Sequence, residues 1–269
     1  MSEKKTNTSW GKVADWYGDY LEGDDTYQSK VILPNLLRLL GNEKPARKNS
    51  SLGGERKILD LACGQGFFAK EVAKLGAKSD LPRACRVVGA DISPELIAKA
   101  RVNAPSASFY IAPATALAFA REAEFDTAYC VLALQNIDDL AKTFAEVKRV
   151  LKVGGRFIMV LNHPCFRVLK GSSWGWDEEK KAQYRRVDSY LTAGKFGIEM
   201  NPSKEKSAQT ISYHRSLQDF FKPLTKAGFA VTRLEEWVSH KVSSPGPRQP
   251  AEDRARKEIP LFLMLEARS

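Results

Sequence analysis

The sequence predicts an α/β fold in which a mostly parallel sheet is covered by helices on both faces. Short apolar runs alternate with helical stretches over residues 57–161, a pattern typical of parallel strands joined by helices. The first strand leads into a glycine turn, Gly64-Gln65-Gly66. The chain has 269 residues, enough for one large α/β domain with a substantial core.

The predicted organisation is an N-terminal helical cap over residues 1–41 and a domain over residues 57–269. Strands are expected at residues 57–63, 87–92, 108–112, 125–134, 156–161, 229–237 and 260–266, and helices at residues 67–75, 94–103, 140–151 and 217–227. Ser93 followed by Pro94 is a typical helix start, because a serine side chain caps free N–H groups and proline suits the first helical turn.

Residues 162–209 interrupt this alternation, because they are polar, rich in aromatic side chains and without clear periodicity. Loops of this length in a compact domain are usually functional or disordered, and bulky aromatics argue against disorder. We therefore expect this segment to be an inserted lid over a binding site. Between the last two predicted strands, residues 243–257 are again proline-rich and basic.

The amino-acid composition is that of a globular protein. Hydrophobic residues make up 43% of the chain and charged residues 28%, as in globular proteins. No signal peptide or membrane span is expected, because the densest apolar stretch, residues 31–40, is short. The four cysteines form no Cys-x-x-Cys pair, so neither a zinc site nor a disulfide framework is expected, and a reducing cytoplasm fits best.

The glycine turn carries the main chemical signal. Glycines at this turn let a ligand approach the main-chain N–H groups at the start of the next helix. Asp60 precedes the turn on the strand, and the third glycine of the dinucleotide fingerprint is absent. A carboxylate here repels a pyrophosphate but can hold an ammonium group. The turn therefore favours a nucleoside bearing an amino acid over a dinucleotide.

Asp91 ends the second predicted strand, where this type of sheet presents a carboxylate to ribose hydroxyls. It lies further from the glycine turn than the usual separation of about 20 residues. A loop insertion at residues 79–86 accounts for the difference. The alternative is that Asp91 is only a solvent-exposed strand end.

With these motifs in order, the chain resembles class I S-adenosylmethionine-dependent methyltransferases. The resemblance is greatest to the type 11 group, which includes quinone-biosynthesis C-methyltransferases. It rests on residues 60–66, 89–93, 125–126 and 150–157. The resemblance implies a Rossmann-like, doubly wound, mostly parallel seven-stranded sheet with an antiparallel last strand, and S-adenosyl-L-methionine as the cofactor. The inserted lid then follows strand 5.

The resemblance also implies a set of cofactor-binding residues. They are Asp60, Ala62, Cys63, Gly64, Gly66, Asp91, Ile92, Ala114, Thr115 and Leu132. The chain departs from the family at Ala62, where relatives carry the first glycine, and at Val153, where they often carry proline. It also lacks an acidic residue near the expected adenine, so that hydrogen bond must come from the backbone or from Thr115. The fourth strand does not end in the Asn/Asp-Pro-Pro-Tyr pattern of enzymes that methylate adenine or glutamine.

Two histidines are candidate catalytic residues. His163 directly follows the fifth strand, whose carboxyl end faces the ligand crevice, and it could take a proton from the methyl acceptor. His214 opens the helix after the insertion and is the second candidate. Each can instead be a hydrogen-bonded structural residue. His163 and Cys165 alone do not make a metal site, so no metal is expected.

Aromatic and basic side chains in the cap and the insertion are candidate acceptor-binding or lid residues. They are Tyr17, Tyr27, Trp174, Trp176 and Arg185. Simple packing is the alternative for each aromatic residue. A lid would assist methyl transfer by excluding water and aligning the attack.

The charge distribution keeps more than one function open. The formal net charge is +10, and residues 152–215 hold 12 basic and 6 acidic side chains. The leading hypothesis is an S-adenosylmethionine-dependent methyltransferase acting on a small-molecule acceptor. The alternatives are an RNA methyltransferase, favoured by the positive charge, and a catalytically silent scaffold protein that only binds the cofactor.

Overall fold

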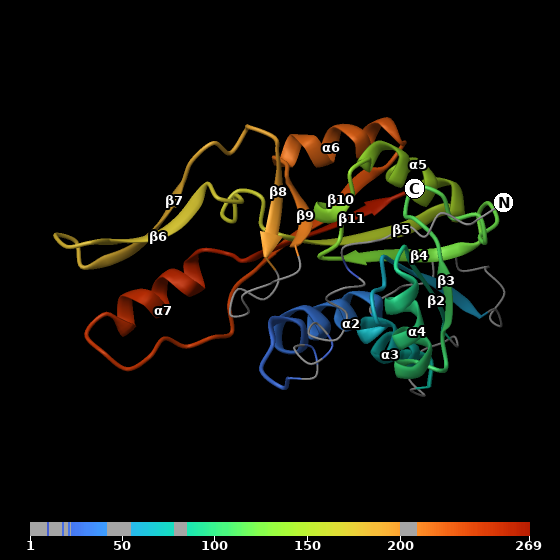
Figure 1. The fold of residues 1–269 in the computed structure, drawn as a ribbon, viewed down its shortest axis with the longest axis horizontal. Helices are drawn as coiled ribbons and strands as arrows, with labels where there is room; N and C mark the ends of the chain where they lie inside the picture. Colours follow the sequence, from blue (N-terminus) through green and yellow to red (C-terminus); the bar gives the residue numbers. More distant parts are fainter. Residues whose placement is uncertain are drawn as a thin grey trace.

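The computed structural model describes residues 10, 18, 21, 23–41, 55–77, 85–199 and 209–269. Its centre is a seven-stranded sheet in the order β10-β11-β5-β4-β1-β2-β3 (Figure 1). Strands β1 to β5 run parallel to one another. Strand β11 pairs antiparallel with both β5 and β10. This confirms the predicted fold class, a doubly wound, mostly parallel sheet with an antiparallel last strand.

The strands and helices follow the predicted alternation. The sheet strands are β1 (Arg56–Leu61), β2 (Cys85–Asp91), β3 (Ser108–Ile111), β4 (Phe125–Val131), β5 (Leu151–Asn162), β10 (Ala230–Trp237) and β11 (Phe262–Arg268). The helices around them are η2 (Gln28–Ile32), α2 (Leu33–Gly41), α3 (Phe67–Ala73), η3 (Lys74–Ala77), α4 (Pro94–Asn103), η4 (Leu134–Asn136), α5 (Leu140–Val150) and α6 (Leu217–Lys226). Helix α4 has the predicted bounds, and the Ser93 hydroxyl accepts a hydrogen bond from Leu96 N at 3.3 Å.

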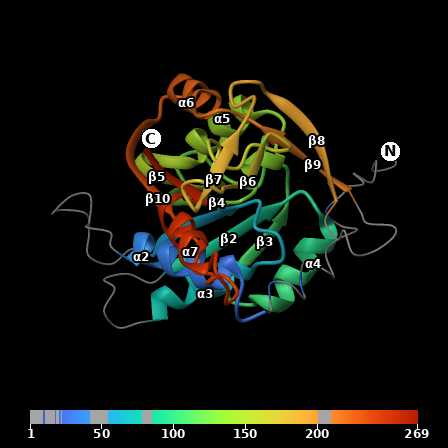
Figure 2. The same cartoon turned by 90° about the vertical axis from the view of Figure 1, so that its left-hand side faces the viewer.

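Two hydrophobic cores lie on opposite faces of the sheet. One contains Phe144 and Val147 of α5 with Phe220 of α6, and the other contains Leu36 of α2 and Val72 of α3. Figure 2 shows α5 and α6 on one side of the sheet and α2, α3 and α4 on the other. Because each strand is covered on both faces, its residues are mostly apolar rather than alternating.

The insertion after β5 has more regular structure than the sequence predicts. It contains the hairpin of β6 (Ser172–Asp177) and β7 (Ala182–Val187), followed by β8 (Gly194–Glu199), which pairs with β9 (Gln209–His214). The proline-rich, basic stretch after β10 contains a helix, α7 (Gln249–Glu258), which packs against β7. Together β6, β7 and α7 make an arm that projects from the sheet (Figure 1).

Cation–π contacts hold the arm together. The guanidinium of Arg185 lies 5.1 Å from the ring centroid of Trp174, and that of Arg248 lies 4.6 Å from the ring centroid of Trp176. Arg248 also pairs with Glu178 at 3.1 Å. Such pairs form only when tertiary packing brings the arm's segments together, so strand periodicity in the sequence does not reveal them.

A buried ion pair joins the last strand of the domain to its centre. Arg156 of β5 donates two hydrogen bonds to the Glu266 carboxylate of β11, at 3.0 and 2.9 Å, and a third to the carbonyl of Leu39. Both charged side chains are 7% exposed. A two-pronged guanidinium–carboxylate contact of this kind satisfies both charges away from water.

We predict that Glu266→Gln lowers the free energy of unfolding by about 3 kcal/mol, because it removes the buried carboxylate charge that pairs with Arg156. Urea unfolding measures the change. Lys181→Gln removes a matched but exposed ion pair with Glu178 and should cost less than about 1 kcal/mol. Equal costs in the two variants would contradict the assignment.

Candidate functional site

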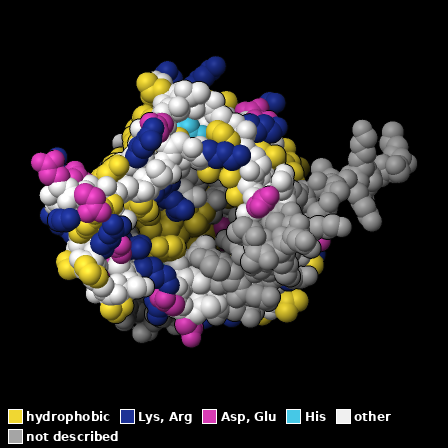
Figure 3. All heavy atoms as spheres, turned by 60° about the vertical axis from the view of Figure 1, so that its left-hand side comes forward, with side chains coloured by type: hydrophobic (Ala, Val, Ile, Leu, Met, Phe, Trp, Pro, Cys, Tyr) yellow, Lys and Arg dark blue, Asp and Glu magenta, His cyan; other side chains and the backbone are white. Residues whose placement is uncertain are grey.

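A cavity of about 430 Å³ opens at the carboxyl ends of β1, β2 and β4. The order of strands reverses between β1 and β4, and open α/β sheets bind ligands at such a reversal. Figure 3 shows a hollow with a largely apolar floor and charged side chains around its rim. The loop after β1, the end of β2 and the loop from η4 to the start of α5 line the cavity.

The turn after β1 brings main-chain groups to the cavity wall. Gly64 and Gly66 both have positive φ, +55° and +80°. A Cβ atom on Gly66 would lie 3.2 Å from Ala100 Cα and from the ring of Phe109, so only glycine fits without displacement. A Cβ atom on Gly64 would meet no atom within 4 Å, which leaves that side of the turn open to a ligand.

Asp60, at the end of β1, is held from behind by a buried tyrosine. The Tyr129 hydroxyl of β4 donates a hydrogen bond to Asp60 Oδ2 at 2.8 Å. Asp60 is 2% exposed, and this burial raises the pKa of its carboxyl to about 8, although the Tyr129 hydrogen bond lowers it. The group is therefore protonated near neutral pH unless a cation enters the cavity and stabilises its charge.

Asp91, at the end of β2, organises the same turn. One carboxylate oxygen accepts from Gly64 N and the other from Ser93 N, both at 2.9 Å. Burial raises the pKa of this carboxyl, and the two main-chain hydrogen bonds oppose the shift. Asp91 is buried, which contradicts the alternative of a solvent-exposed strand end.

The charged side chains that line the cavity share one sign. Among the described residues that line it are the four acids Asp60, Asp91, Asp138 and Asp139, and no lysine or arginine. A pyrophosphate would meet only repulsion from these side chains. A ligand carrying an ammonium or sulfonium charge fits them.

The structure brings nine of the ten predicted cofactor-binding residues to this one cavity. The nine are Asp60, Ala62, Cys63, Gly64, Asp91, Ile92, Ala114, Thr115 and Leu132. Gly66 lies one residue beyond the lining residue Gln65 and acts through the turn. The binding role of all ten stays a prediction.

His163 is buried and hydrogen-bonded through both ring nitrogens. Its Nδ1 accepts from Cys165 N at 3.2 Å, and its Nε2 lies 2.7 Å from Glu236 Oε1. Burial lowers the pKa of the imidazole, and Glu236 opposes this shift. A role as general base stays a prediction, and it requires one of these two contacts to open when the acceptor binds.

His214 and the predicted lid residues lie elsewhere. His214 Nε2–H donates to the Tyr190 carbonyl at 2.8 Å, and the side chain lines a second, smaller cavity. Tyr27 packs edge-on against Phe262 and His240. Trp174, Trp176 and Arg185 belong to the arm and line neither cavity. Tyr17 lies outside the described residues.

Several residues at the site were not predicted from the sequence. Tyr129 lies in an ordinary apolar strand, and nothing in the sequence pairs it with Asp60. Asn136, Asp138 and Asp139 follow β4, and the family resemblance places the end of this strand beside the adenine. Their position directly after a parallel strand was the sequence feature that could have identified them as site residues. No group of three or more metal-binding side chains occurs in the part of the chain that the structure describes.

This sheet order, with a cavity at the strand reversal and an acidic, glycine-rich first turn, defines the class I methyltransferase fold. Residues 59–159 match the family model described as a methyltransferase domain, type 11. A solved S-adenosylmethionine-dependent methyltransferase from Mesorhizobium loti superimposes with a TM-score of 0.62 at 26% identity, covering 87% of this chain and 96% of that one. Residues 59–159 are therefore similar to the methyltransferase domains of this family.

Curated relatives match the same part of the chain. A demethylmenaquinone methyltransferase of Chlorobaculum parvum is 39% identical over 113 residues, 42% of this chain and 43% of the relative. A ubiquinone/menaquinone biosynthesis C-methyltransferase of a Geobacter species is 31% identical over 149 residues, 51% of this chain and 61% of the relative. The chain spans about half the length of these relatives in the matches.

We predict that Asp60→Asn changes how stability depends on pH. In the wild type the folded carboxyl keeps its proton up to about pH 8, while the unfolded one loses it near pH 4. Between these values the folded state binds more protons, so rising pH lowers the free energy of unfolding, by up to about 1.4 kcal/mol per pH unit.

The asparagine side chain introduced by this change cannot ionise, so the variant should lack this part of the slope. Urea unfolding at several pH values from 5 to 8, without ligand, measures it. Asp139 is a partly exposed helix cap, and hydrogen bonds from Lys142 lower the pKa of its carboxyl. Asp139→Asn should therefore keep the wild-type slope in this range. Parallel curves for wild type and Asp60→Asn would contradict the assignment.

Proposed function

We propose that this protein is a methyltransferase that uses S-adenosyl-L-methionine to methylate a small-molecule acceptor. The observation that carries the proposal is the large cavity at the strand reversal, with its glycine turn, four aspartates and no basic lining residue among those described. S-adenosylmethionine bears a sulfonium and an ammonium group, and this lining complements both. The type 11 domain and the names of its relatives support the same activity.

The proposed binding roles follow from the geometry of the strand ends. Asp60, fixed by Tyr129, would face the ammonium group, and its charged form would be stabilised by that contact. Asp91 would accept from the ribose hydroxyls, while it keeps the Gly64 turn in place. Ala114, Thr115 and Leu132 would flank the adenine.

The bound cofactor would supply an electrophilic methyl group for in-line attack by the acceptor. The protein's main task is then to align the acceptor and to exclude water. The insertion after β5 is our proposed lid for this purpose, and its second hairpin, β8 and β9, contacts η4 at the wall of the large cavity. Residues 152–215, which include this insertion, hold 12 basic and 6 acidic side chains.

The two alternative functions have distinct experimental signatures. An RNA methyltransferase would bind RNA with strong salt dependence, because phosphate contacts release counterions. A silent scaffold would bind the cofactor without turnover. Methyl transfer from labelled S-adenosylmethionine to small-molecule extract, compared with total RNA, separates all three.

A cytoplasmic location is part of the proposal. All four cysteines are free thiols, as a reducing compartment allows. No helix among the described segments is long and apolar enough to cross a bilayer.

We predict that Asp91→Ala weakens S-adenosylmethionine binding by about 1.5–3 kcal/mol, because it removes a charged hydrogen-bond acceptor. Isothermal titration calorimetry measures the affinity, and circular dichroism checks folding. Glu122→Ala, which removes an exposed carboxylate outside the cavity, should bind as the wild type does. NADH binding in place of S-adenosylmethionine would reject the cofactor assignment.

We predict that His163→Asn lowers kcat by up to about 10²-fold if His163 takes the acceptor's proton. It should also remove the acidic limb of the kcat profile, which lies below the ordinary imidazole pKa of about 6.5 because burial lowers it. Steady-state kinetics at saturating cofactor tests this, with Glu236→Gln as the companion variant that keeps a hydrogen-bond partner. An unchanged pH profile would make His163 a structural residue, and His214→Asn would be tested next.

A further inference from the structure

A second cavity, of about 60 Å³, lies beside the large one and has the opposite charge. It is lined by Gln135, Asn162, Pro164, Arg167, Leu169, Ser212, Tyr213, His214 and Arg215. No acidic side chain is among these described lining residues. Its volume suits a small group of atoms rather than a whole substrate.

Arg215 is the most distinctive side chain of this basic pocket. Its guanidinium donates to the carbonyls of Leu134 at 3.2 Å and Asp138 at 2.6 Å, and it lies 4.6 Å from the ring centroid of Tyr213. No carboxylate of the described residues lies within ion-pair distance of it. Because a guanidinium has five N–H donors, the two carbonyl bonds leave donors for a ligand.

The neighbouring carboxylates do not neutralise this charge directly. Asp138 and Asp219 act on Arg215 from beyond contact distance, and burial of the guanidinium lowers its pKa. The Asp219 carboxylate is already bound by the main-chain N–H and the hydroxyl of Ser216. A partly buried positive charge satisfied only by neutral carbonyls attracts an anion more strongly than an exposed arginine does.

One short segment separates the two cavities. Asn136, Ile137, Asp138 and Asp139 line the large cavity, while Gln135, one residue earlier, lines the small pocket. Arg215 bonds to the carbonyls of Leu134 and Asp138, which lie on either side of Gln135 and Asn136. A molecule that reaches past Asn136 into the large cavity can therefore place a second group in the basic pocket.

We propose that the methyl acceptor carries a carboxylate, which Arg215 binds in this pocket while the acceptor atom faces the cofactor. The inference rests on the proposed function and names its substrate class. The two neighbouring cavities carry opposite charges: the acidic cavity suits a cationic cofactor, and the basic pocket suits an anionic acceptor. The two-pronged guanidinium geometry suits a planar carboxylate.

The test uses benzoate and its neutral analogue benzamide as probes of the full chain, titrated by NMR with and without saturating S-adenosylhomocysteine. Benzoate should bind the wild type about tenfold more tightly than benzamide. Arg215→Gln should remove this preference, and Arg215→Lys should retain part of it because it keeps the charge.

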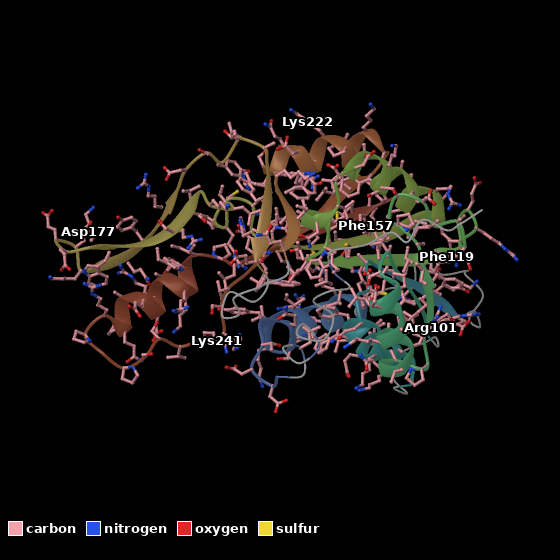
Figure 4. The ribbon with its side chains drawn as sticks, viewed as in Figure 1. Arg101, Phe119, Phe157, Asp177, Lys222 and Lys241 are labelled. Atoms are coloured by element: carbon pink, nitrogen blue, oxygen red, sulfur yellow. The ribbon has the colours of Figure 1, made fainter. Side chains whose placement is uncertain are left out.

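Arg101→Gln is the matched control. Arg101 also donates to a backbone carbonyl, that of Phe109 at 3.0 Å, and it belongs to α4, away from β9 and the arm (Figures 1 and 4). This variant should keep the benzoate preference. Folding of all three variants is checked by circular dichroism.

The possible results separate this inference from the proposed function. Binding of S-adenosylhomocysteine, measured by calorimetry, tests the cofactor site alone. If it binds but benzoate and benzamide bind equally, or if Arg215→Gln keeps the preference, the carboxylate assignment is overturned and the methyltransferase proposal stands. Inorganic phosphate binding more tightly than benzoate would likewise overturn it. A benzoate preference lost only in Arg215→Gln would establish it.

Discussion

The burial of two carboxylates at adjacent strand ends is the constraint on which the site depends. Asp60 and Asp91 end neighbouring parallel strands and face one cavity with no basic lining residue among those described. Removing a carboxylate from water without a cation is costly, and the raised pKa of each group reflects this cost. The described lining residues offer these two carboxylates no positive charge, which a cationic ligand would supply.

The rest of the site compensates for this burial with neutral hydrogen-bond donors. The Tyr129 hydroxyl and the main-chain N–H groups of Gly64 and Ser93 hold the two carboxylates in place. Such donors fix orientation while leaving the net charge available to a cationic ligand. Gly64, whose N–H donates to Asp91, has a positive φ of +55°, a conformation that favours glycine.

The insertion places basic side chains on the side of η4 that faces away from the acidic cavity. Ser212 and Arg215 contact the backbone of residues 134–138 from β9 and the residue after it. The segment that lines one wall of the large cavity is thus held by the insertion's second hairpin. The first hairpin and α7 form an arm that points away from the sheet; Asp177 lies at its tip (Figure 4). The two hairpins therefore serve different parts of the molecule.

The sequence by itself determined the sheet and most of the lining of the large cavity. Apolar runs separated by helical periods specify a parallel sheet, and residues at the ends of such strands must meet at one edge, so Asp60, Gly64 and Asp91 were found together. The insertion's strands were not predicted, because two-stranded hairpins outside the core lack a buried face and so have weak alternation. In β6 every residue is partly or fully exposed.

Only the tertiary structure decided the contacts between distant segments. The Tyr129–Asp60 hydrogen bond, the Arg156–Glu266 ion pair and the pairing of His163 with Glu236 join residues 69, 110 and 73 positions apart. No local propensity encodes such partners, since they arise from strand order and register across the sheet. The separation of charge between the acidic cavity and the basic pocket has the same origin, because packing of β9 against η4 places Arg215 beside the cofactor wall.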